Sequence, residues 1–145
     1  MDACYKLRKG LDIPLRGEAL TMTYPSISSP LYELKPTDFR QLIPKLLVRE
    51  GDPVMAGSPV FCDKDHPEIL FTSPISGTVK QIVRGEKRKL IGIRIVPDGR
   101  NDRVRFPVTS PEELDEDKIR ELLLQSGCWP LITRRPYGTL ALPGE

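Results

Sequence analysis

The chain has 145 residues, enough for one hydrophobic core or for a small domain with part of another, and too few for two complete domains. Its 22 lysines and arginines nearly balance 20 aspartates and glutamates, so the net charge of +2 neither requires nor excludes an anionic partner. The 11 glycines and 15 prolines favour strands and turns over a helical bundle.

The amino-terminal residues predict extended chain. Residues 5–17 predict an edge strand, or two short strands broken at Gly10, because apolar and polar residues alternate and Pro14 disfavours a central strand. Residues 21–34 are expected to lie extended over a sheet, and residues 35–39 to form a short helical turn capped by Thr37 or Asp38. No signal peptide or membrane-spanning run occurs, which predicts a cytoplasmic protein, soluble by itself or docked on a membrane complex.

From residue 45 onward, short apolar segments alternate with turns that contain Gly or Pro. This spacing predicts an all-β sandwich or barrel over the first 99 residues. Strands are expected at 45–49, 60–62, 69–72, 78–83 and 90–96.

The pattern after Gly99 changes to that of one amphipathic helix. Its start is predicted either by a capping box at Ser110 or by Asp115 as the N-cap, and its end by Gly127 in a left-handed conformation. The apolar stripe of this helix would consist of Ile119, Leu122 and Leu123. We therefore expect residues 1–99 to form one β domain, and residues 100–145 a helical linker with the incomplete start of an α/β domain.

Two segments, 48–57 and 71–79, resemble the two halves of a biotinyl/lipoyl-type barrel-sandwich hybrid. Gly51 and Gly57 are expected to supply positive φ or close backbone approach, and Asp52 to bond the turn backbone. Val54 should point into the core, and Pro74 with Gly77 should bend the chain into the return strand. These residues specify a fold and not an activity.

Carrier domains of this type present a modified lysine at a hairpin tip, and Lys64 lies near the corresponding turn here. The Met-Lys-Met pattern of biotinylated domains is absent, and Pro67 stiffens the turn. We therefore expect a plain exposed turn, with a carrier domain modified at Lys64 as the alternative.

No catalytic or metal-binding residue is predicted. His66 is the single histidine and is expected to be a solvated turn residue, while Cys62 is expected to be a small buried hydrophobe. Three separated cysteines without a Cys-x-x-Cys pair cannot readily supply a zinc site, and no phosphate-binding glycine loop occurs.

Two clusters are candidates for a partner interface. The segment 84–89 carries four cations and one anion and would meet anionic lipid, nucleic acid or an acidic protein, or be a solvated turn; without interleaved aromatic residues, nucleic acid is not expected. Near the carboxyl end, large apolar residues flank two arginines, either as an interface patch or as core left uncovered in a truncated second domain. The candidate residues are Arg84, Lys87, Arg88, Lys89, Trp129, Arg134 and Arg135.

Several segments in order along the chain resemble the amino-terminal part of the A subunit of the sodium-translocating NADH:quinone oxidoreductases. These segments are 9–17, 45–59, 71–80, 84–88, 122–130 and 135–137. The C subunit of Rnf electron-transport complexes has a related architecture, but its iron–sulfur cysteine clusters have no counterpart here.

The resemblance implies a peripheral cytoplasmic component of a bacterial inner-membrane pump that couples NADH oxidation and quinone reduction to sodium export. It implies that NADH, flavins and iron–sulfur centres belong to other subunits, and that this part binds no cofactor. It associates the A subunit with quinone without assigning a quinone contact to any residue here.

The expected role is a non-catalytic interaction module that seats the A subunit on its partners, especially the membrane-embedded B subunit. The region after residue 99 would open a Rossmann-like domain. A periplasmic membrane-fusion adaptor is a more distant alternative, because its export signal and coiled-coil helices are missing.

Overall fold

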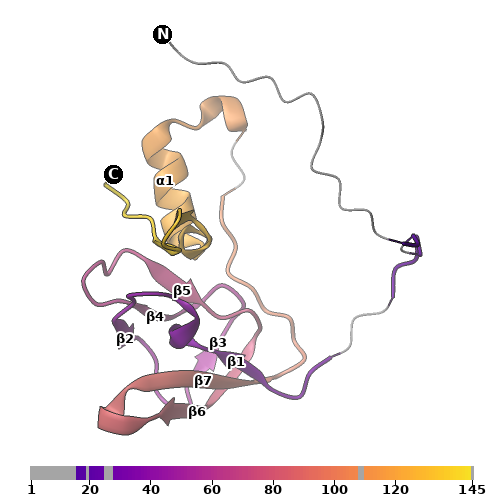
Figure 1. Cartoon of the computed structure of the whole chain (residues 1–145). Coiled ribbons are helices and arrows are strands. Elements are labelled where there is room, and N and C mark those ends of the chain that lie inside the picture. The colour runs from indigo at the N-terminus through magenta and orange to yellow at the C-terminus, as the bar shows by residue number, and fades with distance from the viewer. Residues whose placement is uncertain (1–15, 19, 25–27, 108–109, 145) are drawn as a thin grey trace.

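The computed structural model describes residues 16–18, 20–24, 28–107 and 110–144. The strand predicted within residues 5–17 lies almost wholly outside the described residues. Two antiparallel sheets face each other across one core, and a helix with the carboxyl-terminal residues covers one side of them (Figure 1). This arrangement confirms the prediction of a mainly β fold with a C-terminal helix.

The larger sheet has four strands in the order β1-β7-β6-β3. They are β1 (Tyr32–Leu34), β3 (Pro53–Val54), β6 (Gly77–Arg84) and β7 (Leu90–Pro97). Register shifts between Val79 and Gln81, and between Val83 and Arg84, interrupt the β6–β7 ladder, and irregularities of this kind increase local twist. The smaller sheet has the order β2-β4-β5, formed by β2 (Pro44–Leu46), β4 (Pro59–Asp63) and β5 (Leu70–Thr72).

Side chains of both sheets fill the core. Val79, Ile93 and Ile95 of the larger sheet belong to one core cluster with Val60 and Phe61 of the smaller one, and all five are fully buried. The ring of Phe61 stacks on that of Phe71 with centroids 4.4 Å apart, and Phe39 meets Phe71 edge-on at 4.7 Å. Cys62 is buried as predicted, and burial raises the pKa of its thiol.

The two motifs singled out in the sequence shape the crossings between the sheets. Gly51 and Gly57 have φ of +92° and +91°, and the carboxylate of Asp52 accepts a 2.7 Å hydrogen bond from the N–H of Arg49, as predicted. Gly77 has a different role, because a Cβ there would overlap the carbonyl oxygen of Val96. The close approach of two strands, and not a positive φ, therefore requires glycine at this position. Val54 is buried, as expected.

The short helical turn is present as a 3₁₀ helix at Pro36–Asp38, but its predicted cap is wrong. Lys35 occupies the N-cap position and no side chain caps the turn. The main helix α1 spans Glu116–Gln125 with Asp115 as its N-cap, and Gly127 follows with φ of +73°. Leu123 and Leu124 pack against the core, whereas Ile119 is 44% exposed, so the buried stripe is narrower than predicted.

The carboxyl-terminal residues are more regular than the sequence predicts. A 3₁₀ turn at Trp129–Leu131 precedes a two-stranded hairpin of β8 (Thr133–Arg134) and β9 (Thr139–Leu140). Trp129 belongs to the same core cluster as the sandwich and is 9% exposed, and its indole N–H donates a 2.9 Å hydrogen bond to the carbonyl of Ala141. The interpretation of Trp129 as part of an exposed patch is therefore wrong, while the division of the chain after Gly99 stays a prediction.

Candidate functional site

The turn between β4 and β5 holds two of the candidates considered from the sequence. Lys64 is exposed directly after β4, and its backbone N–H donates a 2.8 Å hydrogen bond to the carbonyl of Ile43. His66 lies 3.6 Å from the carboxylate of Glu68, with its side chain 37% exposed. Among the described residues no group of three His, Cys, Asp or Glu side chains is arranged to hold a metal ion. Modification of Lys64 stays a prediction.

The basic tip, residues 84–89, is a closed turn whose backbone bonds to itself. The N–H of Gly85 donates to the carbonyl of Lys89 at 2.8 Å, and the N–H of Lys89 donates to that of Glu86 at 3.1 Å. Lys87 and Arg88 have φ of +52° and +62°. Left-handed conformations at two successive non-glycine residues turn the chain sharply, and all four cations of the tip are exposed.

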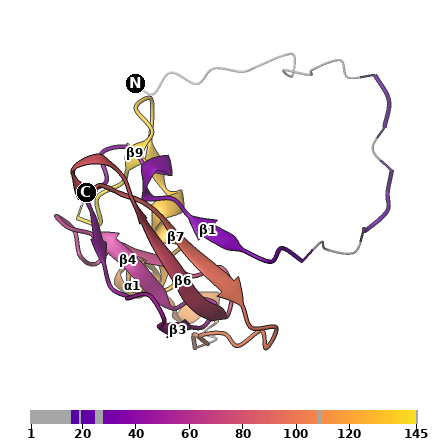
Figure 2. The ribbon, with the colours of Figure 1, turned by 90° about the horizontal axis from the view of Figure 1, so that it is seen from below.

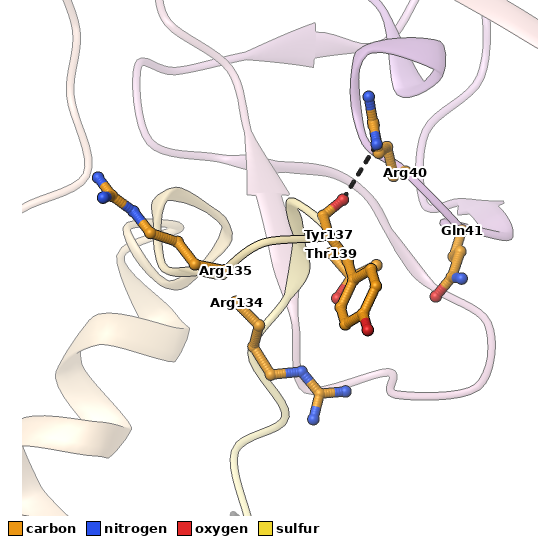
Figure 3. A pocket seen from close by; sticks show the side chains of 6 residues that line it. All are labelled: Arg40, Gln41, Arg134, Arg135, Tyr137 and Thr139. Carbon is orange, nitrogen blue, oxygen red and sulfur yellow. Dashed lines mark hydrogen bonds between the residues drawn. The ribbon is translucent and has the colours of Figure 1, made fainter.

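A second group of cations meets in a pocket of about 640 Å³ (Figure 3). One wall comes from Arg40 and Gln41, directly after the 3₁₀ turn, and the other from the β8–β9 hairpin. The pocket is lined by Arg40, Gln41, Arg134, Arg135, Tyr137 and Thr139.

Specific contacts join these two walls. Arg40 pairs with Thr139 in a parallel bridge, and its guanidinium donates a 3.2 Å hydrogen bond to the carbonyl oxygen of Tyr137. Gln41 holds φ of +63°, which is uncommon for a residue with a side chain. In Figure 3 the Tyr137 ring lies between Gln41 and Arg134, while Arg135 points away from that ring.

The side chains that line the pocket are mainly hydrogen-bond donors. Guanidinium and amide N–H groups, together with hydroxyls, donate hydrogen bonds, and the Tyr137 ring offers an aromatic face. The lining contains no carboxylate, thiol or imidazole. It is therefore suited to binding an anion or a ring that carries carbonyl oxygens, and its lining side chains offer no general base near neutral pH.

The two groups of cations share one side of the molecule. A smaller pocket of about 360 Å³ also includes Arg40 and Gln41, and Lys89 of the basic tip lines it. Figure 2 shows the β6–β7 tip on the same side as β9. We call the seven cations on this side the basic face: Arg40, Arg84, Lys87, Arg88, Lys89, Arg134 and Arg135.

The basic face has an acidic border. A third pocket, about 200 Å³ in volume, shares Arg40 and Arg134 with the pocket of about 640 Å³, and Asp63, Asp65 and His66 line it. The positive surface therefore ends at the turn that carries Lys64.

Arg40 and Gln41 were not among the site residues predicted from the sequence. Neither residue lies in a recognisable motif, and the positive φ of Gln41 has no signal in the sequence. Lys89 lines one pocket with Arg40 and Gln41, and Arg134 and Arg135 line another pocket with the same two residues, whereas Trp129 lies in the core. Within the described residues, no helix is both long enough and apolar enough to pass through a bilayer.

Comparison with known proteins agrees with this architecture. The model of the NqrA N-terminal barrel-sandwich hybrid domain matches residues 5–98. The A subunit of the Na(+)-translocating NADH-quinone reductase of Klebsiella pneumoniae is 37% identical over 143 residues, and that of Tolumonas auensis is 35% identical over 142. The corresponding subunit of Neisseria meningitidis serogroup A is 34% identical over 138 residues.

These alignments cover nearly all of this chain and a minor part of each relative. They include 97%, 96% and 93% of the chain, against 32%, 32% and 31% of the respective relatives. The chain thus spans about a third of the length of these relatives. The matched family model, the sequence identities and the sandwich architecture together show that the chain belongs to the family of NqrA N-terminal barrel-sandwich hybrid domains.

Proposed function

We propose that this chain is the amino-terminal part of the A subunit of a sodium-translocating NADH:quinone reductase and acts there as a non-catalytic docking module. The observation that carries the proposal is the basic face, in which three separate loops place seven cations on one side of a rigid sandwich. The names of the relatives suggest the complex, and the match of residues 5–98 to an N-terminal domain model supports a place at the amino end of the subunit.

In this proposal the subunit is peripheral, on the cytoplasmic side of the bacterial inner membrane, and other subunits hold it there. The membrane-embedded B subunit is the expected main partner. NADH, flavins and iron–sulfur centres would be bound elsewhere in the complex. The basic tip suits docking because its turn is closed by its own backbone hydrogen bonds, so its exposed cations define the contact.

Charge reversal in the assembled complex tests this role. The substitutions Lys87→Glu and Arg88→Glu in the full-length protein should lower its recovery with the membrane subunits and make the remaining complex more sensitive to salt. Arg100→Glu and Arg103→Glu provide a matched control, because they follow β7 at the end opposite the tip. Equal recovery of both variants would contradict docking through the tip.

A second candidate function is contact with the quinone, for which the pocket beside Arg40 is the specific observation. Its volume of about 640 Å³ admits a substituted ring, Tyr137 offers an aromatic face, and Arg134 and Gln41 carry donors suited to quinone carbonyls. The quinone itself is suggested by the names of the relatives.

Calorimetric titration of the full-length protein with a short-chain ubiquinone tests this second function. Tyr137→Ser should weaken binding about two- to tenfold, the range expected for an aromatic contact. Tyr24→Ser is the control, because Tyr24 and Tyr137 are 70% and 71% exposed. If both variants bind like the wild type, the pocket is not the quinone site.

A further inference from the structure

The basic face has the charge distribution of a surface that meets many dispersed negative charges. Its cations come from three loops, at Arg40, at residues 84–89 and at residues 134–135. The two pockets between these loops have volumes of about 640 Å³ and 360 Å³, and neither is lined by a carboxylate. Glu86 within the tip is the single anion of that segment. Such a surface projects a positive potential into solvent.

The same side also exposes an amphipathic aromatic residue. Tyr137 is 71% exposed although its ring is large, and Figure 3 shows it extending beside Arg134. Tyrosine is enriched at membrane–water interfaces, where its ring lies at the level of the headgroups, and arginine side chains place their charge among phosphates.

The shape of the surface favours small mobile anions over one rigid partner. Four of the cations, Arg40, Lys89, Arg134 and Arg135, line two hollows that share Arg40 and Gln41 as a common wall, and the other three lie on the tip beside Lys89. A folded acidic protein would need projections matched to both hollows, whereas separate phosphate headgroups occupy each one independently. A single nucleic-acid strand would call for aromatic side chains between the charges of the tip, and residues 84–89 contain none.

We propose that the basic face and Tyr137 bind the surface of membranes that contain anionic phospholipids. This inference rests on the proposed docking role and extends it, because the module would contact the bilayer itself in addition to protein subunits. Membrane contact would orient the sandwich with Arg40, Tyr137 and the basic tip toward the headgroups.

Vesicle sedimentation of the 145-residue chain tests the proposal without any protein partner. The probes are vesicles of phosphatidylcholine mixed with phosphatidylglycerol, and vesicles of phosphatidylcholine alone. The wild type should partition onto the anionic vesicles and not onto the neutral ones. Binding should fall with added salt, because the Debye length shortens to about 10 Å at 0.1 M ionic strength.

Substitutions of single residues and residue pairs test which part of the surface contacts the membrane. Each basic residue near an anionic surface changes partitioning about fivefold, so Arg134→Gln with Arg135→Gln should weaken binding about 25-fold. The matched control, Arg100→Gln with Arg103→Gln, removes the same charge from the opposite end of the larger sheet and should weaken binding much less. Tyr137→Ser should weaken binding at high salt, where the apolar contribution dominates. Unchanged thermal unfolding would show that these surface variants fold.

Three outcomes overturn the proposal: no binding to anionic vesicles, equal binding to neutral vesicles, or equal loss in the two arginine pairs. If anionic vesicles are not bound while Lys87→Glu and Arg88→Glu still reduce assembly of the complex, the face binds protein alone. If vesicles are bound as expected and assembly is unaffected, the docking role fails and the lipid contact stands.

Discussion

The guanidinium of Arg40 donates a hydrogen bond of 3.2 Å to the carbonyl oxygen of Tyr137, 97 positions further along the chain. Together with the parallel bridge between Arg40 and Thr139, it attaches the β8–β9 hairpin to the loop that precedes β2. Because Arg40 and Tyr137 both line the pocket of about 640 Å³, this contact sets the distance between its two walls.

Removing the Arg40 contact should loosen the hairpin more than the sandwich. In Arg40→Ala, hydrogen exchange at the amide of Ala141, which bonds to the carbonyl of Ile132, should accelerate by up to about tenfold, since one hydrogen bond contributes about 0.5–1.5 kcal/mol. Exchange in the β6–β7 ladder should stay unchanged. NMR exchange measurements on Arg40→Ala and on Arg100→Ala as control would decide this, and uniform acceleration would contradict a local role.

Trp129 should be required for the stability of the sandwich. Trp129→Ala removes a large side chain from the core cluster together with its hydrogen bond to Ala141, and we expect a loss of about 3–5 kcal/mol in the free energy of unfolding. Leu131→Ala, at a side chain 80% exposed, should change it by less than about 0.5 kcal/mol. Urea unfolding measures both, and a small loss in Trp129→Ala would instead support an independent unit after Gly99.

Two of the three motif glycines, Gly51 and Gly77, should respond differently to substitution. Gly77→Ala places a methyl group against the carbonyl of Val96, and because backbone cannot easily yield, it should cost at least about 1–3 kcal/mol. Gly51 has open space around it, so Gly51→Ala should cost only the energy of holding a non-glycine residue in a left-handed conformation, about 1–2 kcal/mol. Asparagine, which tolerates left-handed φ, should be better accepted at position 51 than at 77. Thermal unfolding of the four variants tests this order.

Helix α1 should lose its amino-terminal cap in acid. The backbone N–H of Lys118 donates to the carboxylate of Asp115 at 2.8 Å, and this hydrogen bond lowers the pKa of that carboxyl in the folded chain. Because the folded pKa lies below the unfolded one, the stabilisation by the cap is present above the unfolded pKa and is lost as pH falls through the folded value, below about pH 4.

Asp115→Asn supplies the test, because its amide oxygen still accepts the bond but does not titrate. Circular dichroism from neutral to acid pH should show a smaller loss of helix in Asp115→Asn than in the wild type. Asp117→Asn, which replaces a carboxylate of the first helical turn outside the cap, is the control. An equal loss of helix on acidification in Asp115→Asn and in the wild type would refute the cap assignment.

Lys64 should stay unmodified. Intact-mass measurement of the protein purified from its native host should give the mass of the polypeptide alone, because the turn from Lys64 to Glu68 lacks the pattern that biotin-attaching enzymes recognise. A stoichiometric biotinyl or lipoyl adduct that disappears in Lys64→Arg would show that the chain is a carrier domain and not a docking module.

Local chemistry explains why much of the sandwich could be predicted. Gly51, Asp52 and Gly57 shape only the few residues around them, through positive φ and a local hydrogen bond, so the bends they produce are visible in the sequence as short motifs. The alternation of buried and exposed residues in the first halves of β6 and β7 likewise follows from the two-residue period of a strand. The N-cap of α1 at Asp115 needs only the residue three positions later.

The candidate site followed from none of these local rules. Arg40, Gln41 and Tyr137 have no common motif, and they meet because the carboxyl-terminal hairpin returns to the loop before β2. The burial of Trp129 also depends on that return, since the same aromatic residue would be exposed without the sandwich beneath it. The amino-acid sequence by itself determined the longer strands of the sandwich, the turns between them and the family, because short-range geometry encodes them. Only the tertiary structure decided that the basic tip and the two arginines near the carboxyl end share one face, because contacts between distant segments place them there.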